Sequence, residues 1–97
     1  MILKPETILK ATRDQVSCRV EDESVLLQIA DGVYYGLNDV GTVIWEHLKK
    51  PRSVAELVKH VQSEFDVSAE QCFNDLDELL NDLLRVRLIE VAPEPAS

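Results

Sequence analysis

Alternating apolar and polar positions in the first part of the chain predict a small antiparallel sheet. Residues 16–20 and 25–29 largely alternate, and the acidic run 21–23 separates them as a turn. Asp31-Gly32 marks a second turn, because Gly accepts the positive φ that tight turns require. The β-branched and aromatic run Val33–Leu37 then completes a three-stranded antiparallel meander.

Helical spacing replaces this alternation after Leu37. Asn38-Asp39 can cap a helix that ends before Pro51. Its apolar positions recur at intervals of three and four residues: Val40, Val43, Ile44 and Leu48. Ser53 and Glu56 have capping-box spacing and predict a second helix. Its apolar stripe consists of Val54, Leu57, Val58, Val61 and Phe65.

The third helix carries the strongest periodic signal. Ser68 and Gln71 have the spacing of another capping box, and apolar positions recur from Ala69 to Val86. At 100° per residue they span an arc of about 160°, wider than the roughly 100° that a core-facing stripe needs. Two explanations stay open: neighbouring elements cover this width, which periodicity alone favours, or one edge contacts a partner. One edge contains Cys72, Leu79 and Val86, flanked by Asp75 and Asp82; the other contains Phe73, Leu80 and Leu84, flanked by Asp77.

These elements predict an α+β, winged-helix-like fold in which a three-stranded antiparallel meander precedes three helices. We expect one domain over residues 1–97, with an ordered core from about 16 to 91. Residues 1–15 have no clear period and predict either an arm or an irregular edge strand. Residues 88–91 predict a last short strand or a packed tail, and residues 92–97 a frayed terminus.

Charge and hydropathy narrow the classes of partner. The formal net charge is −8, and most of the acidic excess lies after residue 38. Such a field repels phosphate backbones, so a basic or amphipathic peptide is a better partner than nucleic acid. No apolar run approaches the roughly 18 residues of a membrane span, and the N-terminus lacks the pattern of a secretory signal. We therefore expect a cytoplasmic protein that does not enter membranes.

Residues with catalytic or metal-binding chemistry are sparse. Cys18 and Cys72 lack the spacing of a zinc site and predict two small buried hydrophobes in a reducing compartment. His47 and His60 have no partner that spacing identifies and are expected at the surface. No Gly-rich phosphate loop, nucleophile elbow or HExxH motif occurs. We expect a binding module with no catalytic residue, metal or cofactor.

The predicted third strand is the candidate binding element. If it lies at the sheet edge beside the third helix, its unpaired N–H and C=O groups can accept an extended peptide as an added strand. Its side chains and those of the third helix would then form the selective pockets. For Tyr34 and Tyr35 the ordinary expectation is that one packs inward and the other covers the sheet surface.

An ordered series of short motifs resembles the PqqD-like family. The series is Tyr-Tyr-Gly-Leu-Asn38 with Gly41 and Trp45, then Pro-Arg-Ser-Val-Ala-Glu-Leu, then Glu-Phe-Asp-Val-Ser before a Leu-rich helix. The similarity runs from about Val16 to Val91. Members of this family are recognition elements of pathways that make peptide natural products on ribosomes. The chain looks most like the discrete leader-binding proteins of lasso-peptide clusters, which work beside a separate leader peptidase.

The resemblance implies which residues contact a peptide. Family members bind the leader of a precursor peptide as an added strand, in a groove beside the third helix. On this chain the ladder would come from Val33, Tyr34, Tyr35, Gly36 and Leu37, and the groove from Cys72, Asp75, Leu76, Leu79 and Asp82. The carboxylates could pair with basic leader residues. The family often has Gly near the end of the last helix, where Arg85-Val-Arg87 stands here. The resemblance therefore does not fix the residue at which this helix ends.

Two other functions stay open from the sequence. One is a winged-helix nucleic-acid binder that uses the third helix, against which the acidic flank argues. The other is a structural subunit of an enzyme complex that accepts a helix rather than a strand. An exposed strand edge could also pair with a second copy in a weak homodimer.

Overall fold

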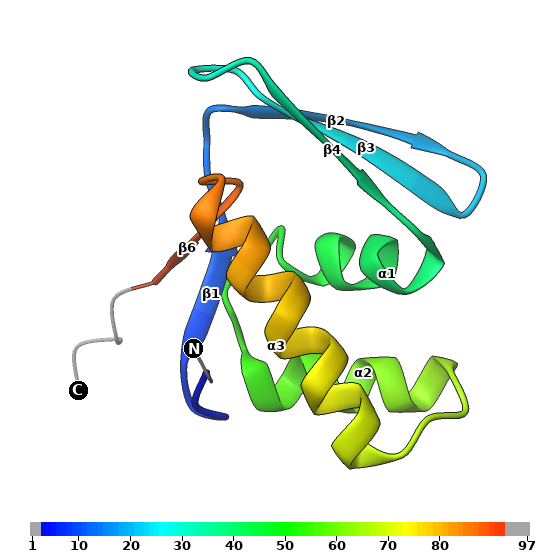
Figure 1. The fold of residues 1–97 in the computed structure, drawn as a ribbon. Helices are drawn as coiled ribbons and strands as arrows, with labels where there is room; N and C mark the ends of the chain where they lie inside the picture. The colour runs from blue at the N-terminus through cyan, green and yellow to red at the C-terminus, as the bar shows by residue number, and fades with distance from the viewer. Residues whose placement is uncertain (1–2, 93–97) are drawn as a thin grey trace.

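The computed structural model describes residues 3–92 and has an α+β fold (Figure 1). Its elements, in chain order, are β1 (Ile8–Ala11), β2 (Gln15–Val20), β3 (Glu23–Gln28), β4 (Val33–Leu37), α1 (Asp39–His47), β5 (Arg52–Ser53), α2 (Val54–Glu64), α3 (Ala69–Arg85) and β6 (Ile89–Val91). The strands form two three-stranded antiparallel sheets, in the orders β2-β3-β4 and β5-β1-β6.

The predicted meander is the β2-β3-β4 sheet. Cys18 lies opposite Val25, and Val25 lies opposite Gly36. The turn between β2 and β3 places Glu21 at φ 56°, and the turn before β4 places Gly32 at φ 65°. The Asp31-Gly32 prediction is therefore confirmed, and Gly32 supplies the backbone conformation that residues with a Cβ adopt at a cost.

The second sheet contains two segments for which the sequence left alternatives, residues 8–11 and 89–91. Residues 8–11 form β1, which lies between β5 and β6 and is thus its central strand rather than an arm or an edge. Residues 89–91 form the short strand β6, one of the two alternatives predicted for this segment. The sequence did not indicate this sheet because β5 has two residues and β6 has three, too few for a readable alternation.

Side-chain caps begin the three helices near the predicted positions. Asn38 accepts the Gly41 N–H at 2.9 Å and begins α1. Ser53 and Glu56 form the complete capping box of α2. At α3 only half of the predicted box is present: Ser68 Oγ accepts the Gln71 N–H at 3.1 Å, whereas the Gln71 side-chain amide donates to Asp75.

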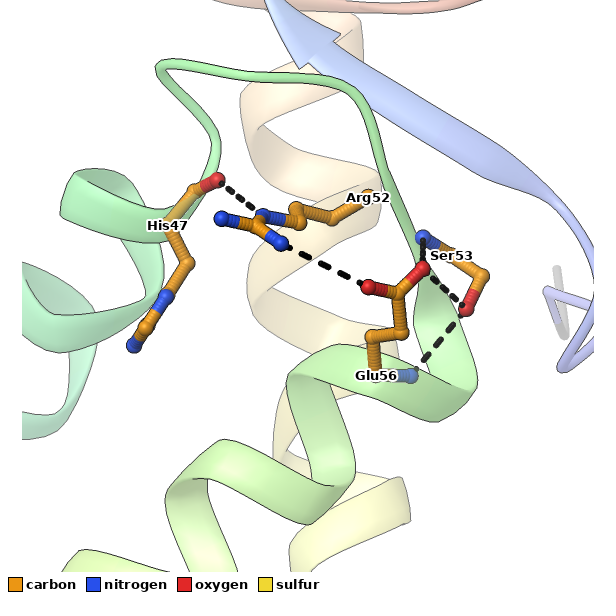
Figure 2. A network of polar contacts seen from close by, with 4 residues as sticks. All are labelled: His47, Arg52, Ser53 and Glu56. Carbon is orange, nitrogen blue, oxygen red and sulfur yellow. Dashed lines mark hydrogen bonds and ion pairs between the residues drawn. The ribbon is translucent and has the colours of Figure 1, made fainter.

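Arg52 connects α1 to α2 through this capping box (Figure 2). Its Nε donates to the carbonyl of His47 over 3.2 Å, and its guanidinium lies 3.6 Å from Glu56 Oε2. Glu56 Oε1 also accepts from the Ser53 backbone N–H over 3.2 Å. The C-terminal carbonyl of α1 and the N-terminus of α2 therefore share one polar network.

The core lies between the meander and the helices. α1 lies between the β2-β3-β4 sheet and α2, and the longer α3 packs against α2 (Figure 1). A buried hydrogen bond of 2.9 Å between Ser24 Oγ and Thr42 Oγ1 joins β3 to α1. Trp45, which the predicted apolar spacing of α1 omitted, is buried with Ile44 and Leu48.

The end of α3 departs from the glycine pattern of the family. The helix ends at Arg85, and Arg87 adopts φ 61°, the left-handed conformation that Gly accepts most readily. Its carbonyl accepts from Thr12 Oγ1 at 2.9 Å. The chain therefore makes the usual helix-ending turn with an Arg in the strained position.

Candidate functional site

One edge of β4 is open. β4 pairs with β3 and has no other strand neighbour within residues 3–92. The backbone N–H of Ile29 donates to the carbonyl of Asp14 over 3.1 Å, which makes these residues a directly hydrogen-bonded pair where β2 meets β3. Because such pairs alternate along an antiparallel ladder, the intervening residues of β3 bond to β4. Tyr34 and Gly36 consequently direct their N–H and C=O groups toward the open edge.

The open edge is fixed against α3 by one hydrogen bond. The half-buried Tyr35 donates its phenol proton to Asp82 Oδ2 over 3.3 Å. Burial raises the pKa of Tyr35 above its usual value, and the negative charge of Asp82 raises it further. Asp82 is also paired with Arg85 at 2.9 Å. Tyr35 and Asp82, both predicted as site residues, are therefore brought together.

A pocket of about 250 Å³ lies between α1 and α3, next to the end of β4. We call it the α1–α3 pocket. It is lined by Asn38, Val40, Gly41, Ile44, Val61, Val67, Cys72, Asp75, Leu76 and Leu79. The walls are mostly apolar, with the Asp75 carboxylate as the charged group, so the pocket suits an apolar side chain whose neighbours are polar or basic.

Four residues predicted on α3 meet in this pocket. Cys72 and Leu76 are buried, whereas Leu79 is half-buried and Asp75 is exposed. Burial raises the pKa of the Cys72 thiol, and the charge of Asp75 raises it further. Cys72 is therefore a small apolar wall group, as the sequence indicated.

The predicted β4 residues differ in exposure, and Val33 at the start of the strand is exposed. Tyr34 is exposed on one face of the sheet, Tyr35 points inward, and Gly36 has open space where a Cβ would stand. Leu37 is buried, and a Cβ added at Gly41 would stand only 3.0 Å from its side chain. Leu37 thus serves the β4–α1 contact, and its side chain does not line the pocket.

α1 contributes a wall of the pocket that the sequence did not indicate. Val40, Gly41 and Ile44 line the pocket from the first turns of this helix, with Val61 and Val67 beside them. Val40 and Ile44 are four residues apart and share a helical face. That spacing is visible in the sequence, where it predicts the helix but not a pocket.

The opposite edge of α3 is covered by the chain itself. The backbone N–H of Leu3 donates to Asp77 Oδ1 over 2.7 Å, and Leu80 is fully buried. Phe73 is half-buried in a shallow apolar depression that includes Pro5 and Val58. One edge of the wide apolar arc is therefore covered by the chain itself, whereas the other edge borders the α1–α3 pocket.

The cysteines and histidines differ from the sequence-based expectation in exposure and in contacts. Cys72 is buried but Cys18 is exposed, so the expectation of two buried cysteines is wrong for Cys18, whose side chain lies on the outer face of the meander. The half-buried rings of His47 and His60 stack with centroids 3.8 Å apart. Burial lowers the pKa of His47, and the neighbouring His60 and Arg52 lower it further.

Within residues 3–92 no group of three or more His, Cys, Asp and Glu side chains is placed to hold a metal ion. Over the same residues, no helix has the length and apolar character to cross a membrane.

Comparison with known proteins identifies the family. The family model described as coenzyme PQQ synthesis protein D (PqqD) matches residues 23–89. The chain belongs to the PqqD family. The match extends from the first residue of β3 to the first residue of β6, so the PqqD region contains β4, α1 and α3 and hence the whole candidate site. None of the curated proteins matches this chain.

A solved structure resembles this PqqD-family chain closely. It is described as TbiB1 in complex with the TbiA(beta) leader peptide. The two proteins share 32% sequence identity and superpose with a TM-score of 0.78. The match covers 88% of this chain and 99% of TbiB1, so both contain the same arrangement of elements.

Proposed function

We propose that this PqqD-family protein binds the leader segment of a ribosomally made precursor peptide as an added strand on β4. The leader would pair with the outward N–H and C=O groups of Tyr34 and Gly36, and an apolar leader side chain would enter the α1–α3 pocket. The observation that carries the proposal is the coincidence of an open strand edge with an apolar pocket at its end. The likeness to TbiB1, solved with a leader peptide, supports the same choice of ligand.

The choice of β4 over β2 rests on the surroundings of each edge. β2 is the other outer strand of the meander and also has an open edge. Only β4 lies next to the α1–α3 pocket and is hydrogen-bonded to α3 through Tyr35 and Asp82. A peptide on β4 would therefore have both a backbone ladder and a side-chain site, whereas β2 offers the ladder alone.

Charge determines the class of leader that fits. The carboxylates of Asp75 and Asp82 lie on the same face of α3, seven residues apart, and Glu78 is exposed beside them. A leader with Lys or Arg on either side of its apolar anchor would complement these groups. The same acidic flank opposes binding of α3 to a phosphate backbone, the alternative that the winged-helix outline leaves open.

The protein would act by presentation rather than catalysis. In this proposal it works in the cytoplasm without metal or cofactor, and a separate leader peptidase or other modifying enzyme performs the chemistry. The resemblance to the discrete leader-binding proteins of lasso-peptide clusters supports lasso-peptide biosynthesis as the pathway. Holding the leader as a strand fixes its direction and leaves the core of the precursor free for the enzyme.

Titration calorimetry with the leader encoded beside this gene tests the proposal. Saturable 1:1 binding at tens of micromolar protein or below is expected, and its affinity should fall with added salt because acidic side chains contribute. A leader with its central apolar residues changed to Asp is the matched control peptide. Absence of binding heat at these concentrations would reject the leader as ligand.

A further inference from the structure

The outer face of the meander is apolar and open. Because cross-strand partners share a face, Val16, Cys18 and Val20 of β2 lie on the same side as Val25 and Leu27 of β3 and Tyr34 of β4. Five of these six side chains are exposed, Val25 to 45% and Tyr34 to 70%. Figure 1 shows α1 beneath the opposite face, and no described helix lies over this one.

β2 directs its apolar residues outward and its polar residues inward, although five of its six residues, on both faces, are exposed. Its residues Gln15, Ser17 and Arg19 lie on the inner side with Leu26 and Ser24, whereas its apolar residues point outward. A strand whose outer face meets only water normally has the opposite arrangement. Single apolar residues on a surface are ordinary, but a contiguous patch across three strands is typical of an interface.

We propose that this outer face docks the enzyme that acts on the bound leader, an inference that rests on the proposed function. The enzyme surface that fits has an apolar patch bordered by Lys or Arg side chains. The border on this protein has an acidic excess. Residues 21–23 lie at one end of the sheet beside Arg19, and Asp14 and Asp31 lie at the other end beside Arg13. A second copy fits less well, because it would bring a further charge of −8 and the same acidic borders against the first.

The position of β4 links this face to the leader site. Tyr34 contributes its side chain to the outer face and its N–H and C=O to the open edge. A leader added to that edge would extend the outer face by one strand and place every second leader side chain beside Tyr34 and Gly36. The docked enzyme would then contact both proteins at once. Leader and enzyme should therefore strengthen each other's binding by the same factor.

Val25→Lys tests the docking face at its centre. Val25 lies between Cys18 and Gly36 on the outer side, so the new ammonium group enters water and not the core. Val91→Lys is the matched control, because Val91 is 58% exposed on β6 of the other sheet. Leader affinity is measured by fluorescence anisotropy, and affinity for the purified leader peptidase encoded beside the precursor is measured by biolayer interferometry.

Val25→Lys should lower the affinity for the enzyme at least about tenfold and change the affinity for the leader less than about twofold. Val91→Lys should change neither. Unchanged enzyme binding by Val25→Lys, or a wild-type protein that binds leader but not enzyme, overturns the inference and leaves the proposed function standing. A wild-type protein that fails to bind leader but docks the enzyme through Val25 overturns the proposed function instead.

Sedimentation velocity tests whether a second copy of the protein, rather than the enzyme, covers the outer face. The wild-type protein should sediment as a monomer at tens of micromolar. A dimer that Val25→Lys dissociates would assign the outer face to a second copy and contradict the enzyme as its occupant. Alkylation of the exposed Cys18 with a bulky maleimide provides an independent check, because it should block enzyme docking while leader binding persists.

Discussion

Tyr35 donates its phenol proton to Asp82 Oδ2 over 3.3 Å and so connects the edge strand β4 to α3. This is a contact between residues 47 positions apart in the sequence, and it fixes the spacing between the open edge and the helix. A peptide strand added to β4 would lie in the space that this contact defines. Tyr35 is thus a positioning residue for the proposed site.

The Tyr35 contact predicts a stability loss at alkaline pH. Burial and the Asp82 charge raise the folded pKa of Tyr35 above its ordinary value of 10.0, so its stabilising effect is complete below pH 10 and is lost as the pH rises above it. Tyr35→Phe should lower the free energy of unfolding by about 1 kcal/mol at neutral pH and reduce the alkaline decline. Urea unfolding between pH 8 and 11 measures both effects. An unchanged alkaline decline in the variant would contradict this assignment.

Leu79→Asp tests the α1–α3 pocket. Leu79 is half-buried at the rim, so the variant should fold, but its carboxylate would face an apolar leader side chain. Leader affinity should fall at least about tenfold, the equivalent of 1.4 kcal/mol. Leu84→Asp is the matched control, since Leu84 is half-buried on another face of α3 and does not line the pocket. Equal affinities for the two variants would place the leader elsewhere.

Gly36→Pro tests the backbone ladder. The N–H of Gly36 points to the open edge, so proline removes a donor to the leader without removing one to β3. Gly36→Ala keeps that N–H and adds a Cβ where no atom lies within 4 Å. Calorimetry should show about fivefold weaker leader binding for proline, from one lost hydrogen bond, and near-native binding for alanine. Proline at Tyr35 would be a poorer test, because that N–H bonds to β3.

The stacked histidines predict an acid-sensitive contact between α1 and α2. Burial holds the folded pKa of His47 below its ordinary value of 6.5, so the associated stability is present above pH 6.5 and is lost as the pH falls below it. His60→Gln should raise the pKa of His47, because it removes the neighbouring charge that lowers it. A pH titration of the imidazole NMR signals checks this. A His47 pKa that stays unchanged in the variant would mean that the stacking has no electrostatic effect.

Arg87→Gly should stabilise the fold. Arg87 adopts φ 61° after α3, a conformation that costs a residue with a Cβ roughly 1 kcal/mol more than Gly. Its backbone carbonyl, which accepts from Thr12, is unaffected by the change. Thermal and urea unfolding should show a gain of up to about 1 kcal/mol. A loss of stability would indicate that the Arg side chain contributes more than the backbone strain removes.

The meander and the helices were predictable because their signals are local. Alternation and turn residues such as Gly32 indicated the three strands, and caps at Asn38, Ser53 and Ser68 indicated the helix starts. The second sheet was not predictable in the same way. Its strands pair residues such as Leu9 and Val91, whose proximity depends on the whole chain being folded.

The candidate site was half predictable for a related reason. Cys72, Leu76 and Leu79 share one face of α3, and periodicity identified that face. The facing wall, with Val40 and Ile44, depends on how α1 packs against α3, which no local pattern encodes. The exposure of Cys18 was mispredicted because alternation shows that residues share a face but does not show which face is covered.

The amide exchange of β4, measured by NMR with and without the leader, tests strand addition most directly. Leader binding should slow exchange at Tyr34 and Gly36, whose N–H groups point to the open edge, by at least about tenfold. Ser17 and Arg19, which have outward N–H groups on the open edge of β2, should exchange at unchanged rates. Protection at Ser17 and Arg19, or leader binding without protection at Tyr34 and Gly36, would contradict strand addition on β4.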